Sequence, residues 1–113
     1  MPNIIFPDYD NSLLNITSSI LKHYNVNLGY KSLEGLDKIL AKNYKNIVLY
    51  LVDAMGSKIL DKHLSSEDLL IRRKIADLTT VFPSTTVAAT TTAITGLPPA
   101  VTGWLGWQQY VHE

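Results

Sequence analysis

The sequence predicts an α/β fold with a parallel central sheet, because two apolar segments are separated by helical patterns. Residues 47–52 form a continuous apolar run, which is typical of a strand that is covered on both faces. Residues 78–82 are rich in β-branched and aromatic side chains and stop at Pro83, which cannot donate to a β-ladder. The helical patterns between the two segments predict a right-handed crossover, so the two strands would run parallel.

The composition indicates one small folded domain with no overall charge. The chain has 113 residues, of which 46% are apolar and 18% are charged, as in globular rather than disordered proteins. Its ten basic and ten acidic residues cancel, which predicts no general attraction to nucleic acid polymers or to anionic membranes. Because the chain has no cysteine, disulfides and thiolate metal ligands are excluded, and a metal would be held by carboxylate, imidazole or hydroxyl groups.

The N-terminal residues carry no recognisable targeting signal. Residues 1–10 contain neither a basic region nor a long apolar stretch, so they do not resemble a signal peptide. No apolar run in the chain approaches the roughly 18 residues of a membrane span. We therefore expect a soluble, cytoplasmic protein, whose oligomeric state the sequence does not define.

Helices are expected on both sides of the first strand. After an irregular arm, apolar periodicity predicts one helix over residues 12–24 and a second over residues 32–42. Between the two strands, further helices are expected over residues 57–64 and 65–77. This order places two helices in the crossover that joins the strands.

Asp53 directly follows the first expected strand and is the first candidate site residue. In open α/β sheets, ligands bind at the carboxyl ends of the strands. A carboxylate beside a glycine turn can bind a divalent cation there. The alternative is that Asp53 caps the helix that begins near Ser57.

A run of hydroxyl residues from Ser84 to Thr86 supplies the second candidate. It precedes an expected short helix over residues 87–95, which Gly96 should end. The N-terminus of a helix carries unpaired N–H groups and a partial positive charge, so it attracts phosphate groups. A hydroxyl there becomes a nucleophile if its proton is removed, which a metal ion can bring about. The alternative is that Ser84 or Thr85 only caps the helix.

The two candidates are expected to meet. In a parallel pair of strands both carboxyl ends emerge at the same sheet edge, so Asp53 and the Thr85–Thr86 turn would lie close together. This convergence favours a functional site over two separate helix caps.

Two stretches carry a family resemblance. NIVLYLVDAMG at residues 46–56 and VFPSTTVAATTTAITGLPPAVTGWLGW at residues 81–107 resemble the start of a type I phosphodiesterase/nucleotide pyrophosphatase domain of the alkaline phosphatase superfamily. In that family the first strand ends in a zinc-binding aspartate. The threonine of a Pro-x-x-Thr turn is the nucleophile, and it lies ten residues before the glycine of a Thr-Gly-x-x-Pro element. Thr86 lies ten residues before Gly96 in this chain.

The resemblance implies a fold, a site and a chemistry. The fold would be the N-terminal portion of an alkaline-phosphatase-like three-layer α/β/α arrangement with a mostly parallel central sheet. Asp53 would be a metal ligand, and Thr86 would be both the catalytic nucleophile and a contact of the second metal. The cofactors would be two divalent metal ions, with zinc implied by the family. The substrate would be a small phosphate ester or a nucleotide, with no nucleic acid polymer or membrane as partner.

The chain departs from the family pattern at two positions. Ala89 stands where members often have an Asn that helps to hold the phosphoryl oxygens. Backbone groups near Thr86 would then supply more of this stabilisation, and Thr85 and the backbone of Val87 are the expected substrate contacts. Thr102 precedes Gly103 where members commonly have His, at a position that we interpret as structural.

The family's later Asp and His metal ligands have no counterparts in this chain. We therefore expect residues 1–113 to be a single partial domain, truncated and inactive alone. Its arm and first helices would occupy residues 1–44, and the first core strand and nucleophile segment would occupy residues 45–113. Two alternatives stay open: a phosphonate hydrolase, phosphomutase or sulfatase-like enzyme of the same superfamily, or a non-catalytic α/β binding or assembly domain.

Overall fold

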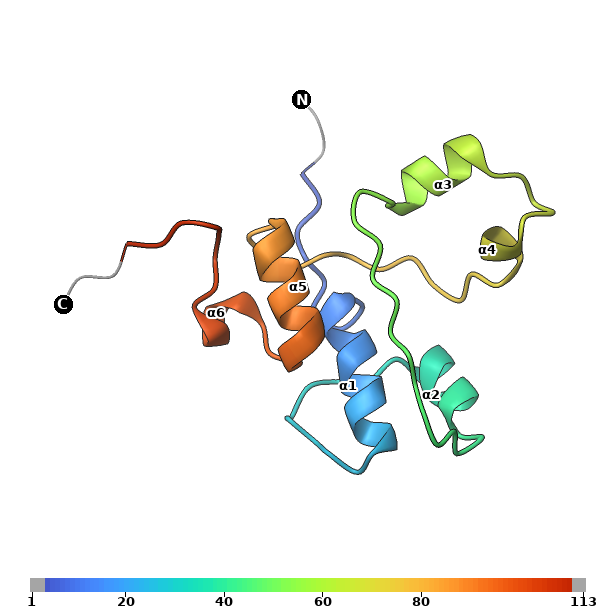
Figure 1. Cartoon of the computed structure of the whole chain (residues 1–113), viewed down its shortest axis with the longest axis horizontal. Coiled ribbons are helices and arrows are strands. Elements are labelled where there is room, and N and C mark those ends of the chain that lie inside the picture. Colours follow the sequence, from blue (N-terminus) through green and yellow to red (C-terminus); the bar gives the residue numbers. More distant parts are fainter. Residues whose placement is uncertain (1–3, 111–113) are drawn as a thin grey trace.

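The computed structural model describes residues 4–110, which form six helices and no β-strand. The two longest helices, α1 (Leu13–His23) and α5 (Thr86–Thr95), pack against each other at the centre of the molecule (Figure 1). α1 also packs against α2 (Glu34–Leu40), and α5 packs against α6 (Pro99–Thr102). α3 (Ser57–His63) and α4 (Leu69–Arg72) lie apart from this cluster.

The buried face of α1 is mostly polar. Besides Leu14 it buries Asn15 and the hydroxyl residues Thr17, Ser18 and Ser19. The Ser18 hydroxyl donates to the Leu14 carbonyl oxygen of the same helix (3.2 Å), and the other two bond to the backbone of neighbouring segments. Thr17 Oγ1 donates to the carbonyl oxygen of Ala93 in α5 (2.8 Å), and Ser19 Oγ accepts the N–H of Leu33 (2.8 Å). Small side chains allow close packing of the helices, and each hydrogen bond removes the cost of burying a polar group.

Asn15 is the centre of this polar core. Its side chain is fully buried, and its Oδ1 accepts both the N–H (2.7 Å) and the hydroxyl (2.8 Å) of Ser12. Its Nδ2 donates to the carbonyl oxygens of Tyr9 and Lys31, both at 2.9 Å. The amide therefore fixes the start of α1, the N-terminal arm and the loop that leads to α2.

Gly96 ends α5, as the sequence predicts, and it also permits the contact with α1. It takes a left-handed conformation with φ of 69°, which favours glycine. A Cβ atom at this position would lie 2.9 Å from Leu21 Cδ1 and 3.2 Å from Thr17 Cγ2. The close approach of α1 and the end of α5 thus depends on the absence of a side chain.

The N-terminal arm lies beside the segment that leads to α5. A single parallel bridge joins Ser12 and Thr79. The Thr79 N–H donates to the Asn11 carbonyl oxygen, and the Leu13 N–H donates to the Thr79 carbonyl oxygen, both at 3.0 Å. Further along, the Phe82 N–H donates to the Tyr9 hydroxyl (3.3 Å). The arm therefore occupies the position at which a partner strand was expected.

The prediction of an α/β fold with a parallel central sheet is wrong, and the three-layer α/β/α arrangement fails with it. Residues 47–52 are extended but pair with no other segment among residues 4–110. Val48 and Tyr50 are 86% and 85% exposed. A strand exists only where a neighbour completes its backbone hydrogen bonds, and Thr79 of the second expected strand bonds to the arm instead.

The helix predictions fared better than the strand predictions. α1, α3 and α5 confirm the helices expected over residues 12–24, 57–64 and 87–95, within a residue or two at each end. Only α4 forms within residues 65–77, and the rest of that segment is irregular. No helix of the part that the structure describes is long and apolar enough to cross a membrane.

Candidate functional site

Asp53 and Thr86, the two residues singled out from the sequence, line one cavity in the structure. The cavity has a volume of about 220 Å³ and lies where the extended segment 51–53 passes the first turns of α5. Its other lining residues come from the start of α1, the segment before α5, and α5 itself: Leu13, Thr80, Ala89 and Thr90. The two candidates thus converge without the sheet that was expected to bring them together.

Thr85 is the N-cap of α5. Its Oγ1 accepts the N–H of Ala88 (3.3 Å) and donates to the carbonyl oxygen of Leu105 (3.3 Å). The side chain therefore serves both a helix cap and an anchor for the segment after α6. With both functions of its hydroxyl in use, Thr85 is poorly suited to act as a nucleophile.

Thr86 differs from its neighbour in that its hydroxyl is not used by the fold. It is the first residue of α5 and is exposed, and its side chain makes no hydrogen bond within residues 4–110. The N–H groups of Thr86 and Val87 likewise find no acceptor among the described residues. The start of α5 therefore presents a hydroxyl and two N–H donors together, which suits an anion such as phosphate.

Asp53 reaches the cavity from a turn after the extended segment. Its Oδ1 accepts the N–H of Ala54 (2.8 Å), and Ala54 takes a left-handed conformation with φ of 56°. The carboxylate is exposed and does not cap α3, whose N-cap is Gly56. The helix-cap alternative for Asp53 is thereby excluded, and its carboxylate is available to a ligand.

Charged groups near the start of α3 hold this turn in place. The Ser57 hydroxyl donates to the Asp77 carboxylate, which also accepts from Lys74 Nζ (2.7 Å). Hydrogen bonds from Lys74 and then Ser57 lower the pKa of Asp77, so this carboxylate is charged at neutral pH. The bonds tie the beginning of α3 to the chain just before Leu78, and thus constrain both segments that enter the cavity.

The described residues supply only part of a metal site. No group of three or more His, Asp or Glu side chains that could hold a metal ion occurs in residues 4–110. Asp53 offers one carboxylate, and threonine hydroxyls are the remaining side-chain oxygens in the cavity. These donors suit a divalent cation in kind, but a two-metal centre needs several more ligands. His23 is remote, with its Nε2 2.8 Å from the Tyr44 carbonyl oxygen, and His112 lies outside the described residues.

Sequence reasoning missed Thr80 and Thr90 as members of the cavity. Thr90 lies four residues after Thr86, and residues at this spacing share one face of a helix. That spacing could have identified Thr90 from the sequence. The Thr90 hydroxyl donates to the Thr86 carbonyl oxygen (2.8 Å), so it is less available to a ligand than the Thr86 hydroxyl. Ala89, where the family often has Asn, does line the cavity but adds no polar group to it.

Comparison with known proteins finds no counterpart: no family model, no curated protein and no solved structure matches the chain. The functional assignment therefore rests on the motif spacing and on the cavity geometry.

Proposed function

We propose that this chain carries the nucleophile and one metal ligand of a metal-dependent phosphoric-ester hydrolase of the phosphodiesterase/nucleotide pyrophosphatase type. The observation that carries the proposal is the shared cavity of Asp53 and Thr86. The two residues are far apart in the sequence. Strand-end and helix-start chemistry points to Asp53 and to the Ser84–Thr86 turn, and the resemblance implies Thr86 within that turn. The motif spacing on which the resemblance depends supports the same pair.

The chemistry of the proposal is phosphoryl transfer through Thr86. The hydroxyl passes its proton to water, its oxygen forms a bond to phosphorus, and the bond from phosphorus to the leaving oxygen breaks, so that the alcohol departs with a proton taken from water. Water then attacks the phosphothreonine, which releases the phosphate product and restores the hydroxyl. The N–H groups of Thr86 and Val87 would stabilise the negative charge that develops on the phosphoryl oxygens.

Asp53 and Thr86 are the residues of this chain that would hold a divalent cation, with zinc implied by the resemblance. Such a cation, when bound, supplies Lewis acidity that favours the alkoxide form of a hydroxyl at neutral pH. Because the described residues offer one carboxylate, the proposal requires further ligands from outside them. We accordingly expect little or no turnover from residues 1–113 alone.

The test is hydrolysis of bis(p-nitrophenyl) phosphate with added zinc, by the 113-residue chain and by the protein isolated at its natural length. In the active form, Thr86→Ala should lower turnover about a hundredfold or more, because nucleophilic catalysis is lost. Asp53→Asn should lower the affinity for zinc, so that a higher zinc concentration is needed for half-maximal turnover. Thr95→Val is the matched control: it removes a hydroxyl at the opposite end of α5, outside the cavity, so turnover by the folded fraction should change little.

A phosphoryl group found on Thr86 by mass spectrometry after rapid quenching would support the nucleophile assignment directly. Near-normal turnover of Thr86→Ala would refute it. A sulfate ester or phosphonate hydrolysed faster than the diester would favour the superfamily alternatives.

The non-catalytic binding or assembly domain is the second candidate, and two observations favour it. Thr85 acts as a helix cap, and the described residues place no cluster of metal-binding side chains together. A natural-length protein that folds but binds neither zinc nor phosphate would decide for this candidate.

A further inference from the structure

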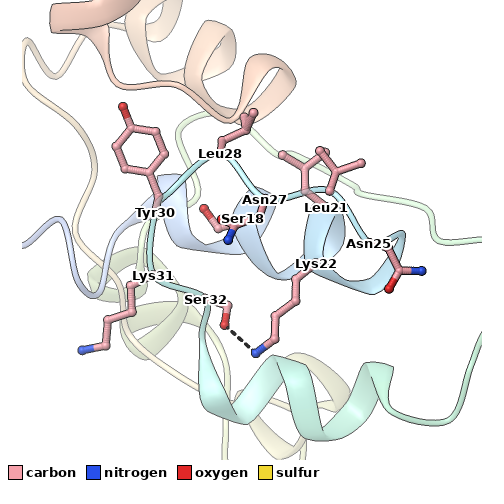
Figure 2. A pocket seen from close by; sticks show the side chains of 10 residues that line it. Ser18, Leu21, Lys22, Asn25, Asn27, Leu28, Tyr30, Lys31 and Ser32 are labelled. Carbon is pink, nitrogen blue, oxygen red and sulfur yellow. Dashed lines mark hydrogen bonds between the residues drawn. The ribbon is translucent and has the colours of Figure 1, made fainter.

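The largest cavity described in the molecule offers no convergent set of polar groups. It has a volume of about 520 Å³ and is formed by the second half of α1 and the loop over residues 25–32 (Figure 2). The Asn25 and Tyr30 side chains extend from opposite ends of that loop and point apart, and Lys22 already donates to Ser32. The exposed aromatic side chains beside the start of α5 form a more specific surface.

The segment after α6 carries two tryptophans that the fold leaves largely uncovered. Trp104 is 55% exposed and Trp107 is 80% exposed. Large aromatic side chains are highly buried on average, and exposed apolar patches commonly mark binding surfaces. These two residues, the tryptophan pair, therefore need an explanation beyond the packing of the helices.

Hydrogen bonds hold the tryptophan pair next to the start of α5. The Thr85 hydroxyl donates to the Leu105 carbonyl oxygen (3.3 Å), and the Trp104 N–H donates to the Thr102 hydroxyl (3.3 Å). Figure 1 shows the segment after α6 running beside the start of α5. Leu105 lies between the two tryptophans, and successive Cα atoms are ~3.8 Å apart. Because Thr86 directly follows Thr85, the pair borders the helix start that suits a phosphate group.

The surroundings of the tryptophan pair are neutral and aromatic. Residues 78–111 contain no Asp, Glu, Lys, Arg or His, so a charged group on a ligand would find no ionic partner in this stretch. Phe82, four residues before Thr86, is also exposed (68%). Aromatic side chains bind a neutral planar ring by stacking, in addition to the apolar area that the ring buries.

We propose that the tryptophan pair binds a planar aromatic ring of the phosphate ester that reacts at Thr86, and so makes the site selective for aryl over alkyl esters. The ring stacks on the indoles while the phosphate meets the N–H groups of Thr86 and Val87. Since hydrogen bonds already hold the segment, binding orders little of the chain. This inference rests on the proposed function and adds a substrate class to it.

The test is an NMR titration of the ¹⁵N-labelled 113-residue chain with phenyl phosphate and with methyl phosphate. Binding is compared rather than turnover, because a phenolate leaves more readily than an alkoxide in any hydrolase. The backbone N–H signals of Thr86 and Val87 report on the phosphate, and the two indole N–H signals report on the ring. Phenyl phosphate should shift both sets along one saturation curve and bind about fivefold more tightly than methyl phosphate, which should shift the backbone signals only. Cyclohexyl phosphate should bind more weakly than phenyl phosphate, because its ring is not planar.

A set of leucine variants localises the effect. Trp104→Leu and Trp107→Leu should each weaken phenyl phosphate binding about twofold to fivefold and leave methyl phosphate binding unchanged. Tyr44→Leu is the matched control, because Tyr44 is also an exposed aromatic residue but follows α2. It should change neither affinity.

The outcomes separate this inference from the proposed function. Equal affinities of phenyl and methyl phosphate, with the Thr86 and Val87 signals shifted by both, would overturn the aromatic site and leave the phosphate site in place. Absence of any shift of these backbone signals would count against the proposed function, and the inference would fall with it. Cyclohexyl phosphate binding as tightly as phenyl phosphate, or unchanged phenyl phosphate binding in both tryptophan variants, would also overturn the inference.

Discussion

Two regions of this protein are held together in opposite ways. In the cluster of α1, α2, α5 and α6, small polar side chains are buried. Many of their hydroxyl and amide groups form hydrogen bonds with backbone groups, as those of Asn15 and Thr17 do. Across residues 44–77 most apolar side chains are exposed and no residue is buried, in α3 and α4 or between them. Burial here follows the availability of packing partners rather than hydrophobicity. Most of the buried polar groups complete their hydrogen bonds, and the Thr92 hydroxyl of α5 is buried without a partner among the described residues.

The largest expected effect of a substitution is at Asn15. Asn15→Leu removes four hydrogen bonds and leaves the groups of Ser12, Tyr9 and Lys31 without their partner. We expect a loss of about 3 to 5 kcal/mol in the free energy of unfolding, measured in urea. The control is Asn46→Leu, at an exposed position beside the extended segment, which should change stability by less than about 0.5 kcal/mol. Equal effects at the two positions would contradict the contrast between the regions.

Gly96→Ala should have the next largest effect. The left-handed backbone disfavours alanine, and the new methyl group would meet Leu21 and Thr17. Strain and overpacking together predict a loss of about 3 kcal/mol. Gly35 is the counterpart, because a Cβ there meets nothing within 4 Å and the residue is helical, so Gly35→Ala should stabilise by about 0.5 to 1 kcal/mol. Thermal unfolding of both variants would show whether the two substitutions change stability in these opposite directions.

A valine pair compares the two regions with one chemical change. Val81 is fully buried, whereas Val48 is largely exposed. Val81→Thr places a hydroxyl in an apolar site and should cost about 2 kcal/mol. Val48→Thr should cost less than about 0.5 kcal/mol. A large loss from Val48→Thr would show that residues 47–52 are covered in solution.

The smallest expected effect is a pH dependence at Asp37, on the edge of the packed cluster. Burial of this carboxyl raises its pKa, but hydrogen bonds from Lys22 and Ser32 lower it by more, so the pKa lies below its ordinary value of 3.8. The ion pair therefore stabilises the fold at neutral pH, and this contribution is lost as the pH falls below 3.8. Asp37→Asn should remove this part of the pH dependence, at a cost of less than about 1 kcal/mol at pH 7. Asp10→Asn, at a more exposed pair, serves as the comparison.

The sequence predicted the helices and their ends well because these depend on local chemistry. Ser12 and Thr85 begin helices, and Gly96 ends one, for reasons contained in a few neighbouring residues. The sheet failed because strand pairing depends on distant segments, and apolar character alone cannot identify a partner for residues 47–52. The Asn15 core was also unpredictable, since its partners Tyr9 and Lys31 become neighbours only after folding.

Asp53 and Thr86 line one cavity as expected, although the sheet that was expected to bring them together is absent from residues 4–110. Asp53 and Thr86 were selected by motif spacing, and the helix start at Thr86 follows from the cap at Thr85. Their meeting in one cavity required the path of residues 51–53 past α5, which the sequence placed only through an expected sheet. The two residues thus meet in a topology different from the one expected, and their roles as nucleophile and metal ligand stay a prediction.

The hydrogen bond from Thr17 to Ala93 joins residues 76 positions apart, and this has a consequence for the order of folding. Closing a loop of that length costs on the order of 4 kcal/mol in chain entropy. α1 has 11 residues and is marginal as an isolated helix. During synthesis it must therefore wait, with its buried hydroxyls solvated by water, until α5 has left the ribosome. Folding of this cluster is then cooperative and late, and a nascent chain that stops before Gly96 cannot complete it.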